Sequence, residues 1–278
     1  MIARVADLHL HTFYSDGTHS PRQLLELAKQ SHLTAVAITD HDIVEGYDEG
    51  LEAASELGLE LIPGIEMSAA SGEKEVHVLG LFIDPKNAPL LEHLAKQKTR
   101  RVARIHDTVK RLQGLGLSIT AEDVFAVVGK GTAGRLHVAQ ALVRKGHVAS
   151  PEEAFTKYIG NSGPAFIQGA STAPKTVIQL IRQAGGIPVL AHPIYLKDDA
   201  LIEQFVRDGL VGIEVYHSGH QPDAVRRYEQ LADRLGLLRT GGTDYHGAAK
   251  EGAPIGSIVI PYALVEALKE WKQTHTSA

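Results

Sequence analysis

The sequence predicts an α/β fold in which strands and helices alternate to build a parallel sheet or barrel, with a small helical insertion. Three observations lead to this prediction. Short apolar runs occur in both halves of the chain, and most are continuous, as expected for strands covered on both faces. Helical patterns separate many of these runs. A middle stretch has helical patterns and no convincing strand. The length of 278 residues fits about two domains, or one α/β barrel of about 250 residues.

The predicted strands and helices follow each other along the chain. The apolar runs that predict strands cover residues 5–8, 35–39, 59–65, 76–83, 187–191, 212–216, 237–241 and 255–260. The patterns that predict helices cover residues 21–30, 49–57, 175–184, 200–208 and 221–235. Ser20 and Pro21 form a helix start, with a capping side chain before a proline at the first helical position. Glycine follows directly after most of the other helices, as is typical of helix ends.

The middle of the chain interrupts this alternation. Apolar residues recur there at three- and four-residue steps, as in a helix, with one longer gap; they are Leu91, Leu94, Val102, Ile105, Val109 and Leu112. Ser150-Pro151-Glu152-Glu153 is a capping box that predicts a further helix start. We therefore expect residues 100–164 to form a helical insertion or cap domain, and residues 1–99 and 165–278 to form the barrel.

The composition excludes several classes of protein. The net charge of −5 gives no general basic character for duplex DNA or an anionic membrane. No apolar run approaches the roughly 18 residues of a membrane span, and the first residues show no signal-peptide pattern, so we expect a cytoplasmic protein. The chain has 15 histidines and no cysteine. Disulfides, thiolate zinc sites, iron–sulfur clusters and a cysteine nucleophile are excluded, so any metal is held by imidazole and carboxylate groups.

The histidines and acids concentrate where predicted strands end. His9 and His11 are alternate residues near the end of the first strand, so both can face one ion. Asp16 follows the first strand in a turn, and His77 lies within the fourth strand. The ends of other strands carry further polar residues; they are His41, Glu66, His192, Glu214, His217, Asp244 and His246. Barrel enzymes build their active sites at the C-terminal ends of their strands, where distant segments converge. The pattern therefore predicts a metal site at one end of a barrel.

These residues occur in motifs that resemble the polymerase and histidinol phosphatase (PHP) family, part of the wider amidohydrolase-like group. The motifs are His9-x-His11-Thr12-x-x-Ser15-Asp16-Gly17, Thr39-Asp40-His41, Gly64-x-Glu66, His77, Ala191-His192-Pro193 and Gly242-x-Asp244-x-His246. They appear in the family's order and cover both parts of the predicted barrel. The resemblance implies a distorted (β/α)₇ barrel with two or three metal ions in its mouth. Within the family, the insertion and Gly134-Arg135-x-His137 look most like the bacterial nucleoside-3′,5′-bisphosphate phosphatase branch.

The resemblance also implies a ligand set for three ions. The first ion would take His9, His11, Glu66 and Asp244. Glu66 would bridge to a second ion, which also takes His77 and His192. The third would take Asp16, His41 and His246. Mixed nitrogen and oxygen ligands suit manganese, iron or zinc, and the resemblance favours Mn²⁺.

Arg135, His137 and His217 are the candidate substrate-binding residues, and Arg135 and His217 the candidate catalytic residues. A guanidinium group binds phosphate in bidentate fashion, and the predicted helix that begins at Arg135 adds backbone donors. His217 could bind phosphate or protonate the leaving oxygen. Alternatives stay open for each: a surface ion pair for Arg135, helix packing for His137, and a structural role for His217. His220 has the same two interpretations.

Two other features are weaker signals. The basic residues Lys96, Lys98, Arg100, Arg101, Arg104, Lys110 and Arg111 could guide RNA, but such a run is more often a solvated helix face. The loop 129–134 is rich in glycine but lacks the Lys-Ser/Thr ending of a P-loop, so it does not indicate ATP use.

The leading functional hypothesis is a metal-dependent phosphatase that removes the 3′-phosphate of a nucleoside 3′,5′-bisphosphate. The alternatives are a 5′-to-3′ exonuclease on short 5′-phosphorylated RNA, a histidinol-phosphate phosphatase, and a non-catalytic PHP binding module. The expected partners are a small nucleotide and, in the exonuclease hypothesis, short RNA. No membrane and no obligate protein partner are expected.

Overall fold

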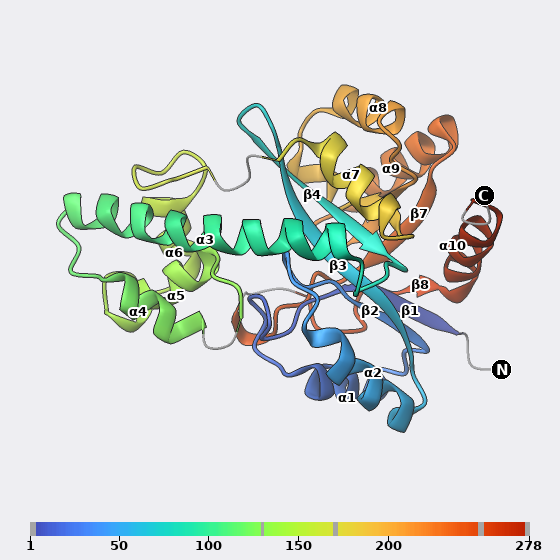
Figure 1. The fold of residues 1–278 in the computed structure, drawn as a ribbon, viewed down its shortest axis with the longest axis horizontal. Helices are drawn as coiled ribbons and strands as arrows, with labels where there is room; N and C mark the ends of the chain where they lie inside the picture. Colours follow the sequence, from blue (N-terminus) through green and yellow to red (C-terminus); the bar gives the residue numbers. More distant parts are fainter. Residues whose placement is uncertain (1–3, 129–130, 169–171, 250–252, 276–278) are drawn as a thin grey trace.

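The computed structural model describes residues 4–128, 131–168, 172–249 and 253–275. They form a mixed α/β fold around one distorted barrel, as the sequence predicts, with a smaller group of helices beside it (Figure 1). The strands of the barrel are β1 (Val5–Leu10), β2 (Ala35–Ile38), β3 (Glu60–Ser71), β4 (Lys74–Leu81), β5 (Ile187–Leu190), β6 (Gly212–His217), β7 (Leu238–Gly242) and β8 (Ile260–Pro261).

The strands hydrogen-bond in the order β7-β6-β5-β4-β3-β2-β1-β8. The sheet is nearly closed because the chain after β7 returns to β1: the Asp244 N–H donates to the His9 carbonyl and the His11 N–H to the Tyr245 carbonyl, both at 3.0 Å. Closure brings the first and the last motif of the sequence side by side.

The prediction of a parallel sheet is correct for four strand pairs and wrong for three. β1–β2, β2–β3, β5–β6 and β6–β7 are parallel, whereas β3–β4, β4–β5 and β1–β8 are antiparallel. β3 runs on to Ser71 and turns directly into β4, with Gly72 at a φ of 60°. Since no crossover helix separates these two strands, they have to pair antiparallel.

The predicted strand 255–260 is wrong except for its last residue. Only Ile260 and Pro261 pair with β1, and the preceding segment forms turns. Gly256 has a φ of 81°, which a strand does not allow, and Ile255 packs beside the cluster of α1 and α2 instead. The run is apolar because Ile255 and Ile260 pack against the core, not because the whole segment is extended.

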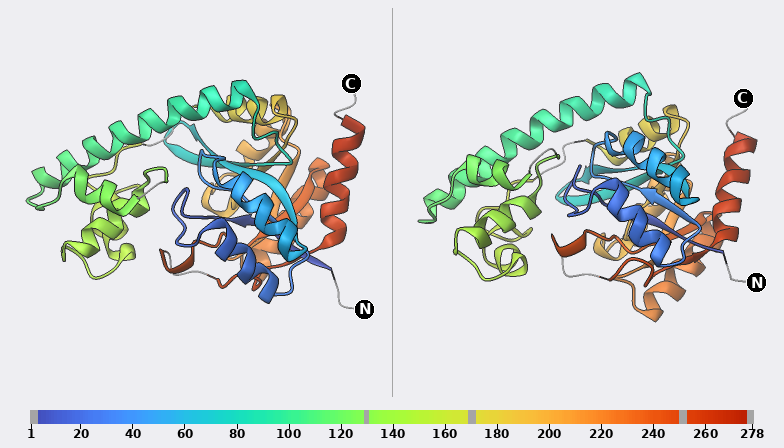
Figure 2. Two further views of the ribbon diagram at one scale, coloured as in Figure 1. Left: turned by 60° about the horizontal axis from the view of Figure 1, so that its bottom comes forward. Right: turned by 90° about the horizontal axis from the view of Figure 1, so that it is seen from below.

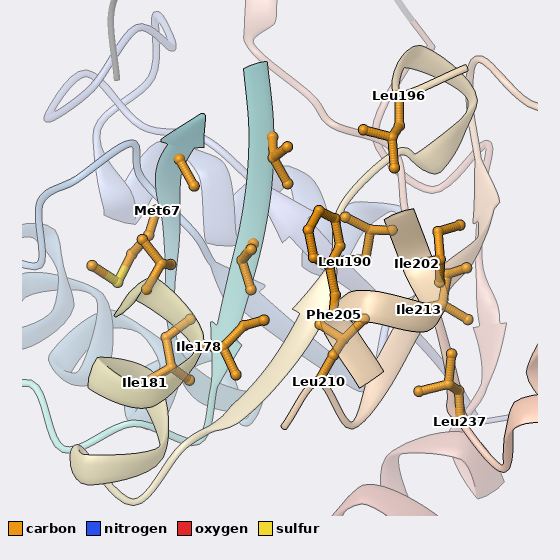
Figure 3. Packing of buried hydrophobic residues seen from close by; sticks show 14 of the residues in the cluster. Met67, Ile178, Ile181, Leu190, Leu196, Ile202, Phe205, Leu210, Ile213 and Leu237 are labelled. Carbon is orange, nitrogen blue, oxygen red and sulfur yellow. The ribbon is translucent and has the colours of Figure 1, made fainter. Parts of the chain in front are cut away.

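Helices cover the outside of the barrel. They are α1 (Pro21–Gln30), α2 (Gly46–Leu57), α7 (Pro174–Gln183), α8 (Asp199–Arg207), α9 (Pro222–Leu235) and α10 (Tyr262–His275), with short turns η2 (Pro193–Tyr195) and η3 (Gly247–Ala249). Apolar faces of α7, α8 and α9 pack against β3–β6 in one buried cluster, in which Ile178 and Ile181 of α7 lie near Met67 of β3 (Figure 3). None of the helices in the described ranges has the length and apolarity to cross a membrane.

The remaining helices are α3 (Ala88–Gly114), α4 (Ala121–Val128), α5 (Arg135–Arg144), α6 (Pro151–Ala154) and the π-helical turn η1 (Phe155–Ile159). Figures 1 and 2 show that α3 extends from the barrel to the group formed by α4–α6. That group has its own apolar cluster, which spans Ile105 to Ala165. The predicted boundary at residue 100 falls inside α3, so a single helix connects the barrel to the helical group.

Candidate metal centre and active site

Two hydrogen-bonded loops place the first candidate ligands at the mouth of the barrel. His9 belongs to β1, and His11 follows that strand. Asp40 holds the loop after His11 by accepting hydrogen bonds from the Thr12 N–H (2.7 Å), the Thr12 hydroxyl (2.6 Å) and the Ser15 hydroxyl (2.6 Å). The role of Asp40 is therefore to shape this loop, and it does not contact a candidate ligand histidine through a hydrogen bond.

The first metal-capable group consists of His9, His11, Glu66 and Asp244. Their ligand atoms all lie within 4.8 Å of one another, and all four residues are buried. Oε2 of Glu66 lies 3.1 Å from Nε2 of His9 and 3.2 Å from Nε2 of His11. Oδ1 of Asp244 lies 3.4 Å and 3.2 Å from the same two nitrogens. This is the same set that the resemblance implied for the first ion.

A second metal-capable group joins His11 to Asp16, His41 and His246. Nε2 of His246 lies 3.3 Å from Oδ1 of Asp16, and Nε2 of His41 lies 3.8 Å from Oδ2 of Asp16. The rings of His11 and His246 stack at a centroid distance of 4.1 Å. The structure thus brings together the three residues expected at the third ion and places His11 beside them.

The other oxygen of Glu66 faces two more histidines. Oε1 lies 2.8 Å from Nδ1 of His77 and 2.9 Å from Nε2 of His192. Nδ1 of His41 lies 3.2 Å from Oε2, and His41, Glu66 and His77 form a third metal-capable group. All nine candidate ligands therefore meet in one cluster, with Glu66 at its centre.

The cluster fits divalent ions. Nε2 of His11, Oδ1 of Asp16 and Nδ1 of His41 are buried without a hydrogen-bond partner, which is costly unless another group satisfies them. Burial raises the pKa of the Glu66 carboxyl, but the charges of the surrounding histidines outweigh burial and keep this pKa well below its usual range. An ionised carboxylate among nitrogen donors is a ligand set for manganese, iron or zinc.

Glu214 of β6 orients two of the candidate ligands. Oε1 of Glu214 accepts a hydrogen bond from Nδ1 of His9 at 3.0 Å, and Oε2 accepts one from the backbone N–H of His192 at 2.8 Å. A carboxylate behind a metal-binding histidine fixes the tautomer and the direction of the ring. Nε2 of His9 therefore faces the cluster.

Two residues of the cluster have unusual backbone conformations. His192 has a φ of 29° and Asp244 a φ of 54°, both positive and neither a glycine. Residues in such sparsely populated regions concentrate at active sites, where the surrounding structure holds them.

His217 faces the cluster. Its Nδ1 accepts a hydrogen bond from the Gly219 N–H at 2.9 Å, so the ring proton is on Nε2. Nε2 is buried without a hydrogen-bond partner and lies 3.6 Å from Oδ2 of Asp244. His220 lies behind it: Nδ1 of His220 hydrogen-bonds the Val215 carbonyl, and its ring contacts that of Tyr228. His217 is thus a donor aimed at the site, whereas His220 packs behind it.

Arg135 starts α5 and approaches the cluster through Glu75. Its Nη2 lies 2.5 Å from Oε2 of Glu75, and its Nη1 donates to Oδ1 of Asn161 at 2.7 Å. Oε1 of Glu75 lies 3.6 Å from Nε2 of His77. Arg135 therefore forms an ion pair, which was one of the two alternatives for this residue. The ion pair lies at the border of the cluster of candidate metal ligands.

His137 lies in the first turn of α5 and lines a cleft of about 360 Å³ between the helical group and the barrel. Its Nδ1 accepts a hydrogen bond from the Gly134 N–H at 3.1 Å. The other lining residues are Phe13, Asp16, Gly17, Thr18, Val127, Val128 and Gln140. Because Asp16 belongs to the cluster, the cleft opens directly next to the candidate metal site. Residues 129–130 of the glycine-rich loop lie outside the described ranges.

The basic run on α3 is not only a solvated face, contrary to the expectation from the sequence. Arg101 turns inward and donates from Nε (3.0 Å) and Nη2 (2.5 Å) to Oδ2 of Asp42, and from Nη2 to the Ser68 hydroxyl at 3.0 Å. Arg104, three residues later, is also partly buried. The signal in the sequence was the three-residue spacing of Arg101 and Arg104, because residues at that spacing share one side of a helix.

The barrel, its histidine-rich mouth and the buried carboxylates define a metal-dependent phosphoesterase. A sequence model of the PHP domain matches residues 7–163, and the chain belongs to the PHP domain family.

Individual relatives are similar over nearly the whole chain. A 5′-3′ exoribonuclease of Haemophilus influenzae is 32% identical over 86% of this chain and 89% of its own length. A 3′,5′-nucleoside bisphosphate phosphatase of Chromobacterium violaceum is 30% identical over 90% of both chains. The solved structure of a protein from Bifidobacterium adolescentis, described as a metal-dependent phosphoesterase, superimposes with a TM-score of 0.87 at 35% identity, over 95% of this chain and 94% of its own.

Proposed function

We propose that this chain hydrolyses the 3′-phosphate of nucleoside 3′,5′-bisphosphates, such as adenosine 3′,5′-bisphosphate, to give a 5′-mononucleotide and phosphate. The observation that carries the proposal is the histidine and carboxylate cluster bordered by the Arg135–Glu75 ion pair, which combines a hydrolytic site with a cation for a second phosphate. The similarity to the Chromobacterium phosphatase supports it.

The proposed ligand assignment has three parts. His9, His11, Glu66 and Asp244 would hold one ion; Glu66, His77 and His192 a second; and Asp16, His41 and His246 a third. Bound divalent ions, for which we propose Mn²⁺, neutralise phosphate charge and lower the pKa of bound water. The three-part assignment fits the two oxygens of Glu66, one of which faces His9 and His11 and the other His77 and His192.

The chain's own groups would position the substrate. The Nε2–H of His217 points at the site and can donate to an oxygen of the reacting phosphate or to the leaving 3′-oxygen. We propose that residues 100–164 act as a cap on the barrel of residues 1–99 and 165–278. The cap would supply Arg135 and His137 from the start of α5.

A second candidate is 5′-to-3′ hydrolysis of short 5′-phosphorylated RNA. The similarity to the Haemophilus exoribonuclease and the inward arginines of α3 favour it. A 5′-phosphorylated RNA end shares the two-phosphate pattern of the bisphosphate, so one site can take both.

A hydrolysis panel on the manganese-loaded protein tests the proposal. Phosphate release is measured for the monoesters, and release of 5′-mononucleotides for the oligoribonucleotide, because cleavage of a phosphodiester frees no inorganic phosphate. The panel contains adenosine 3′,5′-bisphosphate, 5′-AMP, histidinol phosphate and a 5′-phosphorylated oligoribonucleotide. The expected result is the highest kcat/KM with the bisphosphate. Preference for the oligoribonucleotide would support the second candidate, and preference for histidinol phosphate would overturn both.

A further inference from the structure

We propose that Arg101, Arg104 and Arg135 form a separate phosphate site beside the metal-capable cluster, which holds the phosphate that is not hydrolysed. The proposal rests on the proposed function, because it assigns the second phosphate of that substrate to named residues. Arg104 is its central member; in the interpretations above it is only one residue of the basic run that could guide RNA.

The three guanidinium groups come together where α3 meets the start of α5. Arg101 and Arg104 are three residues apart and share one side of α3. Nη1 of Arg101 donates to the Ala133 carbonyl at 3.3 Å, two residues before Arg135. These contacts join the two helices, and Figure 1 shows α3 passing from the barrel to the group that contains α5.

Two of the three arginines are held in place by carboxylates. Arg101 is paired with Asp42, and its side chain is only 13% exposed. Arg135 is paired with Glu75 and also hydrogen-bonds Asn161. Their guanidinium groups are therefore fixed before a ligand arrives, which reduces the entropy lost on binding.

Arg104 has no such partner. Across the described ranges, no hydrogen bond or ion pair of its guanidinium is found, although the residue is partly buried. Its pKa falls to about 10, because burial and then the charges of Arg101 and Arg135 disfavour the cation, while Glu75 and Asp42 compensate only in part. A partly buried cation without a partner is unfavourable, and a bound anion would relieve it.

The arginine group lies next to the cluster but outside it. Asp42 follows His41 in the chain, and Glu75 lies 3.6 Å from His77, so each carboxylate separates an arginine from a candidate ligand. A phosphate bound by the arginines is thus a neighbour of the hydrolysed phosphate and not the same group. Guanidinium groups bind phosphate through paired hydrogen bonds, so a phosphate monoester is the expected ligand.

Arg104→Met is the decisive variant because it removes the charge and keeps an unbranched apolar stem. Lys98→Ala is the matched control, since Lys98 is an exposed cation on the same helix. Both proteins and the wild type are loaded with Mn²⁺. Phosphate release from adenosine 3′,5′-bisphosphate and from adenosine 3′-monophosphate, which lacks the second phosphate, is compared, and binding of 5′-AMP is measured by calorimetry.

We expect Arg104→Met to raise KM for the bisphosphate and Kd for 5′-AMP at least about tenfold, the usual effect of losing one charge-assisted contact. Hydrolysis of the 3′-monophosphate and the melting temperature should stay at wild-type values, and Arg104→Lys should retain part of the binding. Lys98→Ala should match the wild type throughout.

The binding measurement separates the two proposals. If the wild type releases no phosphate from the bisphosphate but Arg104→Met still binds 5′-AMP at least about tenfold more weakly, the phosphate site stands and the proposed function fails. If Arg104→Met binds 5′-AMP as the wild type does, or loses both nucleotide substrates equally, the separate phosphate site is overturned.

Discussion

Glu214 contacts no substrate in the proposed function, yet it fixes two candidate ligands at once. It accepts from the ring of His9 and from the backbone of His192, and both contacts need an acceptor oxygen. A glutamine has only one oxygen, so Glu214→Gln would leave one of these two N–H groups unsatisfied in a buried place.

We therefore expect Glu214→Gln to lower Mn²⁺ affinity or phosphate release by about 10- to 100-fold, as with other groups behind metal ligands. Metal content after dialysis, measured by mass spectrometry, and turnover would be compared with those of Glu229→Gln. Glu229 accepts from the Tyr216 hydroxyl away from the cluster. Full metal content and full turnover in Glu214→Gln would show that this carboxylate does not orient the ligands.

Arg135 differs from Glu214 because its guanidinium group pairs with Glu75 and Asn161, neither of which is a candidate ligand. Arg135→Ala should leave metal content unchanged and lower kcat/KM for the bisphosphate at least about tenfold, since a charge-assisted phosphate contact is lost. The control is Arg144→Ala, at the other end of α5. Unchanged kinetics in Arg135→Ala would remove this residue from the substrate site.

The candidate ligand histidines and Arg135 could be predicted from the sequence, whereas the inward direction of Arg101 could not. His9 and His11 follow from strand geometry, because alternate residues of a strand face the same way. Whether Arg101 points inward depends on the rotation of α3 against the barrel, which is set by contacts with Asp42 and Ser68 from distant segments. A run of basic residues indicates positive charge, but it does not indicate which side of the helix packs against the barrel.

At the closure of the barrel, β7 approaches β1 so closely that a side chain has no room. A Cβ on Gly242 would lie 2.5 Å from both the backbone nitrogen and the Cβ of His9. Asp7 reinforces this contact by accepting from the N–H (3.1 Å) and the hydroxyl (2.7 Å) of Thr243. The glycine is thus required by the position of a candidate ligand.

Gly242→Ala should lower the free energy of unfolding by about 1–3 kcal/mol, the usual cost of overpacking, and reduce metal content because His9 must move. Gly114→Ala is the matched control: its added Cβ meets nothing within 4 Å, and an alanine there favours the helix. Denaturant unfolding and metal analysis check both. Wild-type stability and metal content in Gly242→Ala would contradict the close contact.

The sequence pattern predicts strand pairing correctly where a helix follows the strand. It predicts the pairing wrongly where a turn takes the place of that helix. Parallel pairing of β1, β2 and β3 follows from the helices between them. The antiparallel pairing of β3 and β4 depends on the turn at Gly72, and the run 255–260 lost its strand to the turn at Gly256. An apolar run indicates that a segment is buried. The neighbouring strand and the parallel or antiparallel direction depend on the segments before and after it.

Across the whole molecule, the candidate ligands come from segments between residues 9 and 246, so the metal-free cluster is held together by its own charges. Burial lowers the pKa of His11, but contacts with Asp244 and Glu66 outweigh it and raise this pKa to about 9. Burial also lowers the pKa of His77, but the charge of Glu66 outweighs burial and raises this pKa to about 10. Both imidazoles are therefore protonated at neutral pH when no ion is bound.

This protonation sets the pH dependence of the metal-free protein. A histidine whose pKa is higher in the folded than in the unfolded chain stabilises the fold fully below about pH 6.5, and this contribution is lost as the pH rises through the folded value. The melting temperature of the chelator-treated protein should therefore fall between pH 7 and about 10. Over the same range, Mn²⁺ affinity should rise, because ions and protons compete for the same nitrogens.

The manganese-loaded protein is the control for this last experiment, since all other titrating groups are the same and the ion replaces the ligand protons. Its melting temperature should fall less between pH 7 and 10 than that of the metal-free protein. The melting temperature of metal-free His77→Gln should also fall less over this pH range, because the variant lacks one of the protonated imidazoles. If the melting temperature falls equally with pH in the metal-free wild type, its metal-loaded form and the variant, the histidines of the cluster are not protonated as proposed.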